Sequence, residues 1–115
     1  MLKEIAKMHI DNELSLARKA FNEGNAGKVR VCARRAAGIA ISYWLESHPE
    51  MDWGESAMNL LNEVKDYKPI KEEIRLAAEK LTTSINNKST MKITADPLSD
   101  SNIIIEYFFN NNGGK

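Results

Sequence analysis

The chain has 115 residues, and its 16 Lys and Arg residues are balanced by 16 Asp and Glu residues, so its formal net charge is zero. This length corresponds to one domain, and 43% apolar residues suffice for a hydrophobic core, which excludes a disordered or fibrous chain. Zero net charge excludes a uniformly basic nucleic-acid-binding protein, although it allows a local basic patch. The single cysteine cannot form an internal disulfide, and no apolar run approaches the roughly 20 residues of a membrane span, so we expect a cytoplasmic protein without membrane association.

Two long helices are predicted in the first half of the chain. The first spans about residues 2–23, where helical spacing relates Leu2, Ile5, Ala6, Leu16, Ala17 and Ala20, and Gly24-Asn25 ends it. The second begins at residue 26 or 28 and ends before His48-Pro49, because the residue before a proline avoids the helical region. Its part from Ile39 to Leu45 is apolar nearly all round, which is typical of a central helix or of a contact between subunits.

Two further helices are predicted between residues 50 and 90. Asp52 and Glu55 have the spacing of a capping box that opens a short third helix. Pro69 suits the first position of a fourth helix, which Asn86-Asn87 ends. The polar residues 88–95 then predict a loop.

The last segment, residues 97–109, is predicted to be a short fifth helix, with Asp96-Pro97 as its cap and first-turn pair. The triple Ile103-Ile104-Ile105 would also suit a strand, but no second strand is predicted with which it could pair. We therefore expect an all-α fold, an antiparallel four-helix up-and-down bundle with a short C-terminal fifth helix. Residues 1–109 form one domain in this prediction, and 110–115 form a disordered tail.

Basic residues concentrate around the turn between the first two helices. The candidate ligand-binding residues there are Lys28, Arg30, Arg34 and Arg35. Arg30 and Arg34 lie one helical turn apart, and the free amides at a helix N-terminus favour anions, so the pattern predicts a site for the phosphate of a nucleotide or RNA. The alternative is a solvated face, or pairing with acidic residues of this chain or of a neighbouring subunit.

His9 and Glu13 form a second candidate site near the centre of the apolar stripe of the first helix. A buried carboxylate needs a partner, so the two residues are predicted to form a buried polar pair. The functional alternative is an acid or base at His9, oriented by Glu13, in a small hydrolase or RNase. No further ligands stand at a recognisable spacing, so no metal site is predicted, and no cofactor motif is present.

Three stretches of the sequence are similar to a known family. They are Ala17-Arg18-Lys19-Ala20-Phe21-Asn22-Glu23-Gly24, then Arg34-Arg35-Ala36-Ala37-Gly38-Ile39-Ala40 with Tyr43-Trp44-Leu45, and finally Asp96-Pro97. This arrangement, over about residues 10–110, resembles the HEPN family (higher eukaryotes and prokaryotes nucleotide-binding domain). The resemblance implies a dimerising helical bundle from RNA-targeting, toxin–antitoxin or nucleotidyltransferase-associated systems.

Active members of that family cleave RNA with an Arg and a His a few residues apart near the last helices. That motif is absent here, because the only two histidines are His9 and His48 and neither follows an Arg at such a spacing. The sequence therefore predicts a non-catalytic HEPN-like homodimer that binds a nucleotide, RNA or a partner protein of the nucleotidyltransferase type. The alternatives are a purely structural or protein-interaction dimer module and, third, an enzyme that uses His9 and Glu13.

Overall fold

A computed structural model describes residues 2–83 and 96–110, which form helices and connections with no strand among them. The elements are α1 (Lys3–Asn22), α2 (Ala26–Leu45), α3 (Ala57–Lys65), α4 (Glu72–Thr82), α6 (Pro97–Ile105) and the π-helical turn η1 (Glu106–Asn110). The all-α prediction is confirmed, and the last segment is a helix rather than a strand. No helix in these two ranges is long and apolar enough to cross a membrane.

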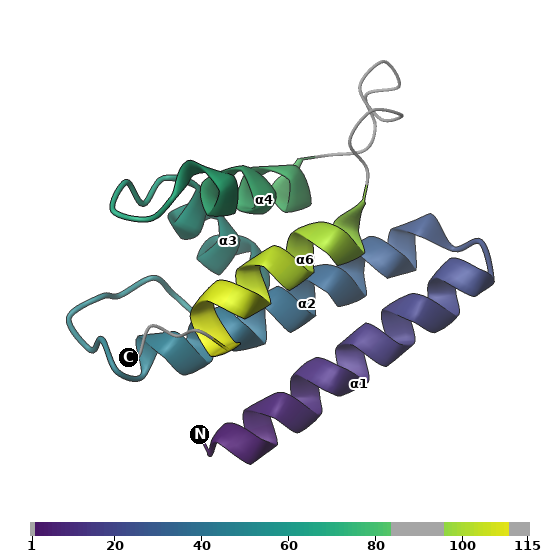
Figure 1. Cartoon of the computed structure of the whole chain (residues 1–115), viewed down its shortest axis with the longest axis horizontal. Coiled ribbons are helices and arrows are strands. Elements are labelled where there is room, and N and C mark those ends of the chain that lie inside the picture. The colour runs from purple at the N-terminus through teal and green to yellow at the C-terminus, as the bar shows by residue number, and fades with distance from the viewer. Residues whose placement is uncertain (1, 84–95, 111–115) are drawn as a thin grey trace.

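Helix α2 is the central element of the fold. It contacts α1, α3, α4, α6 and η1, while α3 packs on α4 and α4 packs on α6. Figure 1 shows α1 returning alongside α2 in the opposite direction after a tight turn, with α6 lying along α2. In the C-terminal half of α2, Ile41 is fully buried and Trp44 is 8% exposed. Most of the apolar surface from Ile39 to Leu45 packs within the chain, as expected of a central helix, while Ile39, Tyr43 and Leu45 are only partly buried.

The hydrophobic core lies between α2, α3, α4, α6 and η1. Its largest fully buried side chains are Phe108, Ile41, Leu60, Leu61, Leu81 and Ile104. Trp44 makes an edge contact with Phe108, with ring centroids 5.0 Å apart. The hydroxyl of Ser101 donates a buried hydrogen bond of 2.8 Å to the carbonyl of Ala33, which ties α6 to α2.

A glycine allows α2 to approach the start of α3. A Cβ atom at Gly38 would lie 3.0 Å from the Ala57 Cβ and 3.2 Å from its Cα. Real Cβ atoms essentially never come closer than 3.0 Å, so a larger residue at this position would push α3 away.

Two of the predicted helix starts are wrong. Helix α3 begins after Ser56, whose hydroxyl accepts a 3.1 Å hydrogen bond from the Asn59 amide, rather than at Asp52. Gly54 intervenes with φ +87°, a left-handed conformation that ends any helix begun at Asp52. Helix α4 begins at Glu72 after the extended residue Lys71, so Pro69 lies in the connection.

Other predicted boundaries are confirmed. Gly24, with φ +76°, follows α1, and the Asn25 side chain caps α2 by accepting from the Lys28 amide. Asp96 caps α6 by accepting from the Ser99 amide at 3.1 Å. The predicted tail 110–115 begins one residue too early, because Asn110 is the last residue of η1 and its side-chain amide donates to the Glu106 carboxylate at 2.9 Å. The predicted end of the fourth helix at Asn86-Asn87, the loop 88–95 and residues 111–115 of the tail lie outside the described residues.

Candidate functional site

The four predicted basic site residues are divided between two sides of α2. Arg30 and Arg34 reach α4, where the Arg34 Nε donates to the Leu81 carbonyl at 2.6 Å. Arg35 lies toward α1, with its Nη1 3.9 Å from the Glu13 Oε1. Lys28 lies on the same side as Arg35, since the charges of both act to lower the pKa of the Cys32 thiol. The structure thus brings Arg30 and Arg34 together and does not make one patch of all four.

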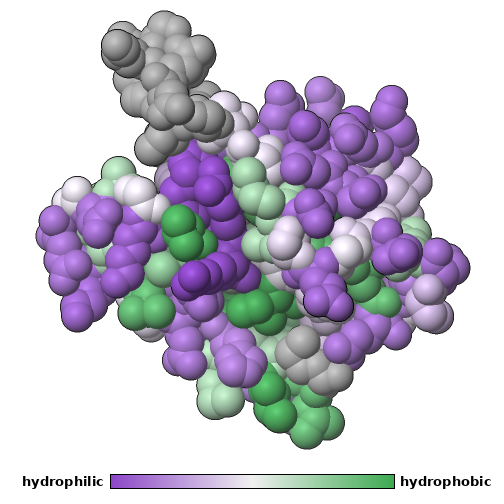
Figure 2. Space-filling view, turned by 180° about the vertical axis from the view of Figure 1, so that it is seen from behind, coloured by the Kyte–Doolittle hydropathy of each residue, from purple (hydrophilic) through white to green (hydrophobic). Residues whose placement is uncertain are grey.

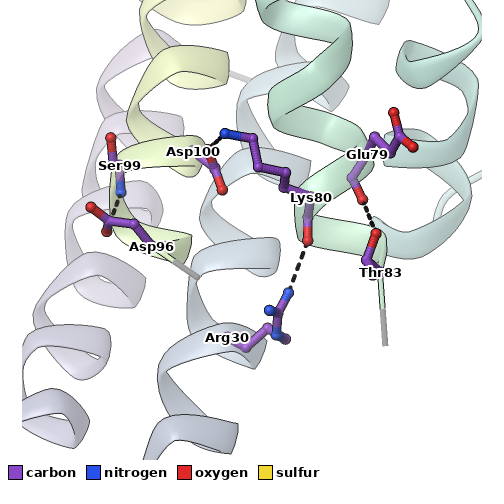
Figure 3. Close-up of polar contacts among 7 residues, drawn as sticks. All are labelled: Arg30, Glu79, Lys80, Thr83, Asp96, Ser99 and Asp100. Atoms are coloured by element: carbon purple, nitrogen blue, oxygen red, sulfur yellow. Dashed lines mark hydrogen bonds and ion pairs between the residues drawn. The ribbon is translucent and has the colours of Figure 1, made fainter. Parts of the chain in front are cut away.

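Arg30 and Arg34 hold the C-terminal end of α4. The Arg30 Nη1 donates to the carbonyl of Lys80 at 3.0 Å, as Figure 3 shows, and more weakly to that of Leu81 at 3.5 Å. The last carbonyls of a helix have no partner within it and carry the negative end of the helix dipole, so two guanidinium groups satisfy and stabilise them. Burial lowers the pKa of both arginines, and the charge of Arg30 lowers that of Arg34 further.

Asp100 is the buried anion of this cluster. It lies in the first turn of α6, is 5% exposed, and has its Oδ1 3.6 Å from the Lys80 Nζ (Figure 3). Burial raises the pKa of its carboxyl group, and the nearby charges of Lys80 and Arg30 oppose that shift. Two cations, Lys80 and Arg30, therefore act on this carboxylate, while the charge of Asp96 raises its pKa further.

We expect the substitution Asp100→Asn to change stability in a pH-dependent way. A carboxyl group whose pKa is raised by folding stabilises the protein fully below its unfolded pKa, about 3.9, and loses that contribution as pH rises through the folded pKa. As pH rises from roughly 4, near the unfolded pKa, to about 7, the parent loses this contribution and the Asn variant does not. The Tm of the variant minus the Tm of the parent should therefore become more positive over that range. Thermal unfolding followed by circular dichroism measures it, and a difference that falls with pH would contradict the assignment.

The predicted buried pair of His9 and Glu13 is wrong. His9 is exposed, whereas the Glu13 side chain is 21% exposed and packs toward α2. The Glu13 Oε1 is buried without a hydrogen-bond partner, and its nearest cation is Arg35. The pKa of the Cys32 thiol is raised by its burial and by the adjacent Glu13 carboxylate, which makes this thiol a poor nucleophile.

The second histidine, His48, packs against Trp44 and is half-buried. The His48 ring stacks on Trp44 with centroids 3.9 Å apart, and its Nδ1 lies 2.9 Å from the Trp44 carbonyl oxygen. Within residues 2–83 and 96–110, no group of three or more His, Cys, Asp or Glu side chains could hold a metal ion.

A shallow groove runs beside α2 between α1 and the start of α3. One pocket of about 270 Å³ contains Glu13 and Arg35, and its other lining residues are Gly38, Ile39, Ser42, Glu55 and Ala57. A second pocket of about 470 Å³ shares Ser42 and Glu55 and extends past Trp53. The groove offers charged and apolar contacts to a bound molecule.

The outer face of α1 is a feature that the sequence analysis missed. Ile5, Met8 and Leu16 are 41%, 52% and 41% exposed, although Ile5 and Leu16 were assigned to the buried stripe. Figure 2 views the molecule from behind and shows apolar side chains in several patches separated by hydrophilic ones. The signal in the sequence was that α1 has more apolar positions than one face of a helix can bury.

Comparisons of this chain with protein-family models, with curated proteins and with solved structures find no match. The functional conclusion therefore rests on the side-chain arrangement described above.

Proposed function

We propose that this chain is a non-catalytic helical module that binds a protein partner through the outer face of α1. One observation carries the proposal: Ile5, Met8 and Leu16 are each exposed by two-fifths or more, on a helix whose opposite side packs on α2. Scattered surface apolar residues are ordinary, but several on one side of one helix are typical of a binding surface. The protein-interaction module is thus favoured over the nucleotide-binding reading of the sequence.

The proposal includes the HEPN-like, antiparallel four-helix arrangement that the sequence suggests, and a cytoplasmic location. The packing of α2 against α1, α3 and α4 is compatible with such an arrangement. The environment of the two histidines supports a role without catalysis, because His9 is exposed and His48 stacks on Trp44.

Site-specific photocrosslinking tests the proposed surface. In one variant of the full chain, Met8 is replaced by the photoreactive residue benzoyl-phenylalanine. In the control variant the same replacement is made at Leu76 on α4. Both variants are produced and irradiated in the cells that normally express the protein. Both side chains are exposed, by 52% and 44%, so neither replacement should disturb the core. We expect a protein adduct of defined mass from position 8, none from position 76, and loss of the adduct when Leu16→Asp is added. Equal labelling from both positions, or an adduct that survives Leu16→Asp, would reject the surface.

A second candidate function is binding of a phosphate group, from RNA or a nucleotide, at Arg30 and Arg34. The observation that favours it is that the two guanidinium groups lie together at the end of α4, where the charge of Arg30 acts on Arg34. Each guanidinium group has five N–H donors, and Arg30 and Arg34 use only part of them on the α4 carbonyls. Such binding would weaken steeply with salt concentration.

A further inference from the structure

The groove beside α2 has an acidic lining. Among the described residues that line its two pockets, four are carboxylates and Arg35 is the one cation. The carboxylates are those of Glu13, Glu46, Asp52 and Glu55. The whole chain has no net charge, so this is a local excess of negative charge. A hollow lined by one sign of charge concentrates ligands of the opposite sign.

One carboxylate oxygen of the groove lacks a hydrogen-bond partner. The Glu13 Oε1 is buried and accepts no hydrogen bond, and the Arg35 Nη1 lies 3.9 Å away, beyond hydrogen-bond distance. Buried polar atoms in proteins are nearly always paired, so an unpaired one calls for an explanation. The Arg35 side chain is 58% exposed and is not held against Glu13. A cationic donor that enters the pocket would supply the missing hydrogen bond.

The other end of the groove combines carboxylates with an aromatic ring. Asp52 and Glu55 are exposed, and their side chains form no ion pair with any residue of 2–83 or 96–110. Trp53 lines the larger pocket and is half-buried, with its ring fixed against Trp44 at 5.7 Å and Tyr67 at 5.2 Å between centroids. A guanidinium group stacks on an indole face and pairs with carboxylates through two parallel hydrogen bonds. An ammonium group lacks the flat shape for both contacts, so this end of the groove suits arginine better than lysine.

The length of the groove fits a short peptide. Its lining residues on α2 run from Arg35 to Glu46, which corresponds to about 16 Å at 1.5 Å per residue. An extended peptide advances about 3.3 Å per residue, so about five residues would cover this distance. A shallow groove does not enclose a small molecule, whose sites bury most of its surface.

From the acidic lining, the unpaired Glu13 oxygen and the placed Trp53, we infer that this groove binds a short, extended, arginine-containing segment of another protein. One arginine of that segment lies on Trp53 beside Asp52 and Glu55, and a second cation reaches Glu13. None of the outer α1 residues of the proposed function lines either pocket. The groove is therefore a separate site, and neither proposal depends on the other.

Fluorescence anisotropy with a labelled penta-arginine peptide tests the inference on the full chain. Penta-lysine has the same charge but neither stacks nor pairs bidentately, so penta-arginine is expected to bind at least about threefold more tightly. The ionic strength is about 0.15 M, where attraction between exposed charges is screened beyond roughly 8 Å. Equal affinities of the two peptides, or no binding of penta-arginine up to about 1 mM, would overturn the inference.

Neutral variants separate the groove from general attraction between charges. Asp52→Asn with Glu55→Gln keeps the side-chain shapes and removes both carboxylates, and it should weaken penta-arginine binding by about fivefold or more. Asp66→Asn with Glu63→Gln makes the same charge change at exposed positions outside the groove, and binding should stay within about twofold of the parent. Circular dichroism confirms that both variants are folded. Equal weakening in the two double variants would overturn the groove as the binding site.

Nuclear magnetic resonance of the ¹⁵N-labelled chain locates the bound peptide. Penta-arginine should shift the amide signals of Glu13, Ser42 and Gly54, which line the two pockets, and leave those of Met8 and Leu16 in place. Shifts confined to Met8 and Leu16 would overturn the groove and leave the outer face of α1 standing as the binding surface. Loss of the position 8 crosslink would instead reject that face and leave the groove standing.

Discussion

Reversing the charges of Arg30 and Arg34 together, by Arg30→Glu and Arg34→Glu, is expected to lower the free energy of unfolding by about 3 kcal/mol or more. Both side chains donate to carbonyls at the end of α4, and a charged donor contributes about 1.5–3 kcal/mol in such a hydrogen bond. The new carboxylates would also face the negative end of the α4 dipole. For a domain of this size the Tm should fall by roughly 12 °C or more, as thermal unfolding would measure.

A matched control changes the same number of charges away from α4. Lys19→Glu and Lys28→Glu introduce the same charge difference at exposed positions, so the unfolding free energy should change by about 1 kcal/mol or less. Equal losses in the two double variants would show that charge alone, rather than the contact with α4, sets the effect. If the parent binds RNA and only the Arg30 and Arg34 variant loses binding while its Tm is unchanged, these arginines form a phosphate site instead.

The substitution Gly38→Leu is expected to destabilise the protein by about 2 kcal/mol. Leucine favours a helix over glycine by nearly 1 kcal/mol, but overpacking costs about 1–3 kcal/mol, and here it meets the main chain of Ala57. The Cβ alone would stand 3.0 Å from that residue's Cβ, so α3 must move away from α2. Urea unfolding at equilibrium measures the loss.

Gly27→Leu is the control for that substitution, because it places the same residue at another glycine of α2. A Cβ at Gly27 meets only the Asn25 side chain, at 3.9 Å, so this variant should be as stable as the parent or slightly more stable. If both leucine variants lose stability equally, close packing at Gly38 is not the cause.

Helix positions that depend on local chemistry were predicted well from the sequence. The residues that end α1 and cap α2 and α6, namely Gly24, Asn25 and Asp96, act through groups within three residues along the chain. The start of α3 was missed because Asp52 and Ser56 both suit an N-cap, and only the left-handed Gly54 between them decides for Ser56. A preference for one backbone conformation at a glycine cannot be read from residue types alone.

His9 was misplaced because α1 has apolar residues on two faces. Averaging Ile5 and Leu16 with the truly buried Ala6 and Ile10 moves the apparent centre of the buried face toward His9. Glu13 lies nearer the true centre, which is why it is only partly exposed. When a helix has apolar residues on two faces, their helical spacing in the sequence predicts a single averaged face. This spacing does not indicate which of the two faces is buried.

The roles of Arg30 and Arg34 could not be predicted from sequence for a different reason. Their partners are the main-chain carbonyls of Lys80 and Leu81, which every residue type possesses. The sequence analysis offered pairing with acidic side chains as the structural alternative. In the structure, the acidic residue that acts on Arg30 is Asp100, and it does so only through its charge. These contacts depend on where the C-terminal end of α4 lies relative to α2. That position follows from the packing of the whole fold rather than from the residues of either helix alone.

The placement of α6 has a consequence for how the chain folds as it is synthesised. The hairpin of α1 and α2 joins neighbouring segments and can form early. The core against α2 and α4 stays open until Ile104 and Phe108 arrive and Ser101 bonds to the Ala33 carbonyl. A nascent chain that has emerged only as far as α4 therefore displays the apolar side of α2, which chaperones recognise and which promotes aggregation. Completion of this core therefore depends on α6, which is synthesised after α4.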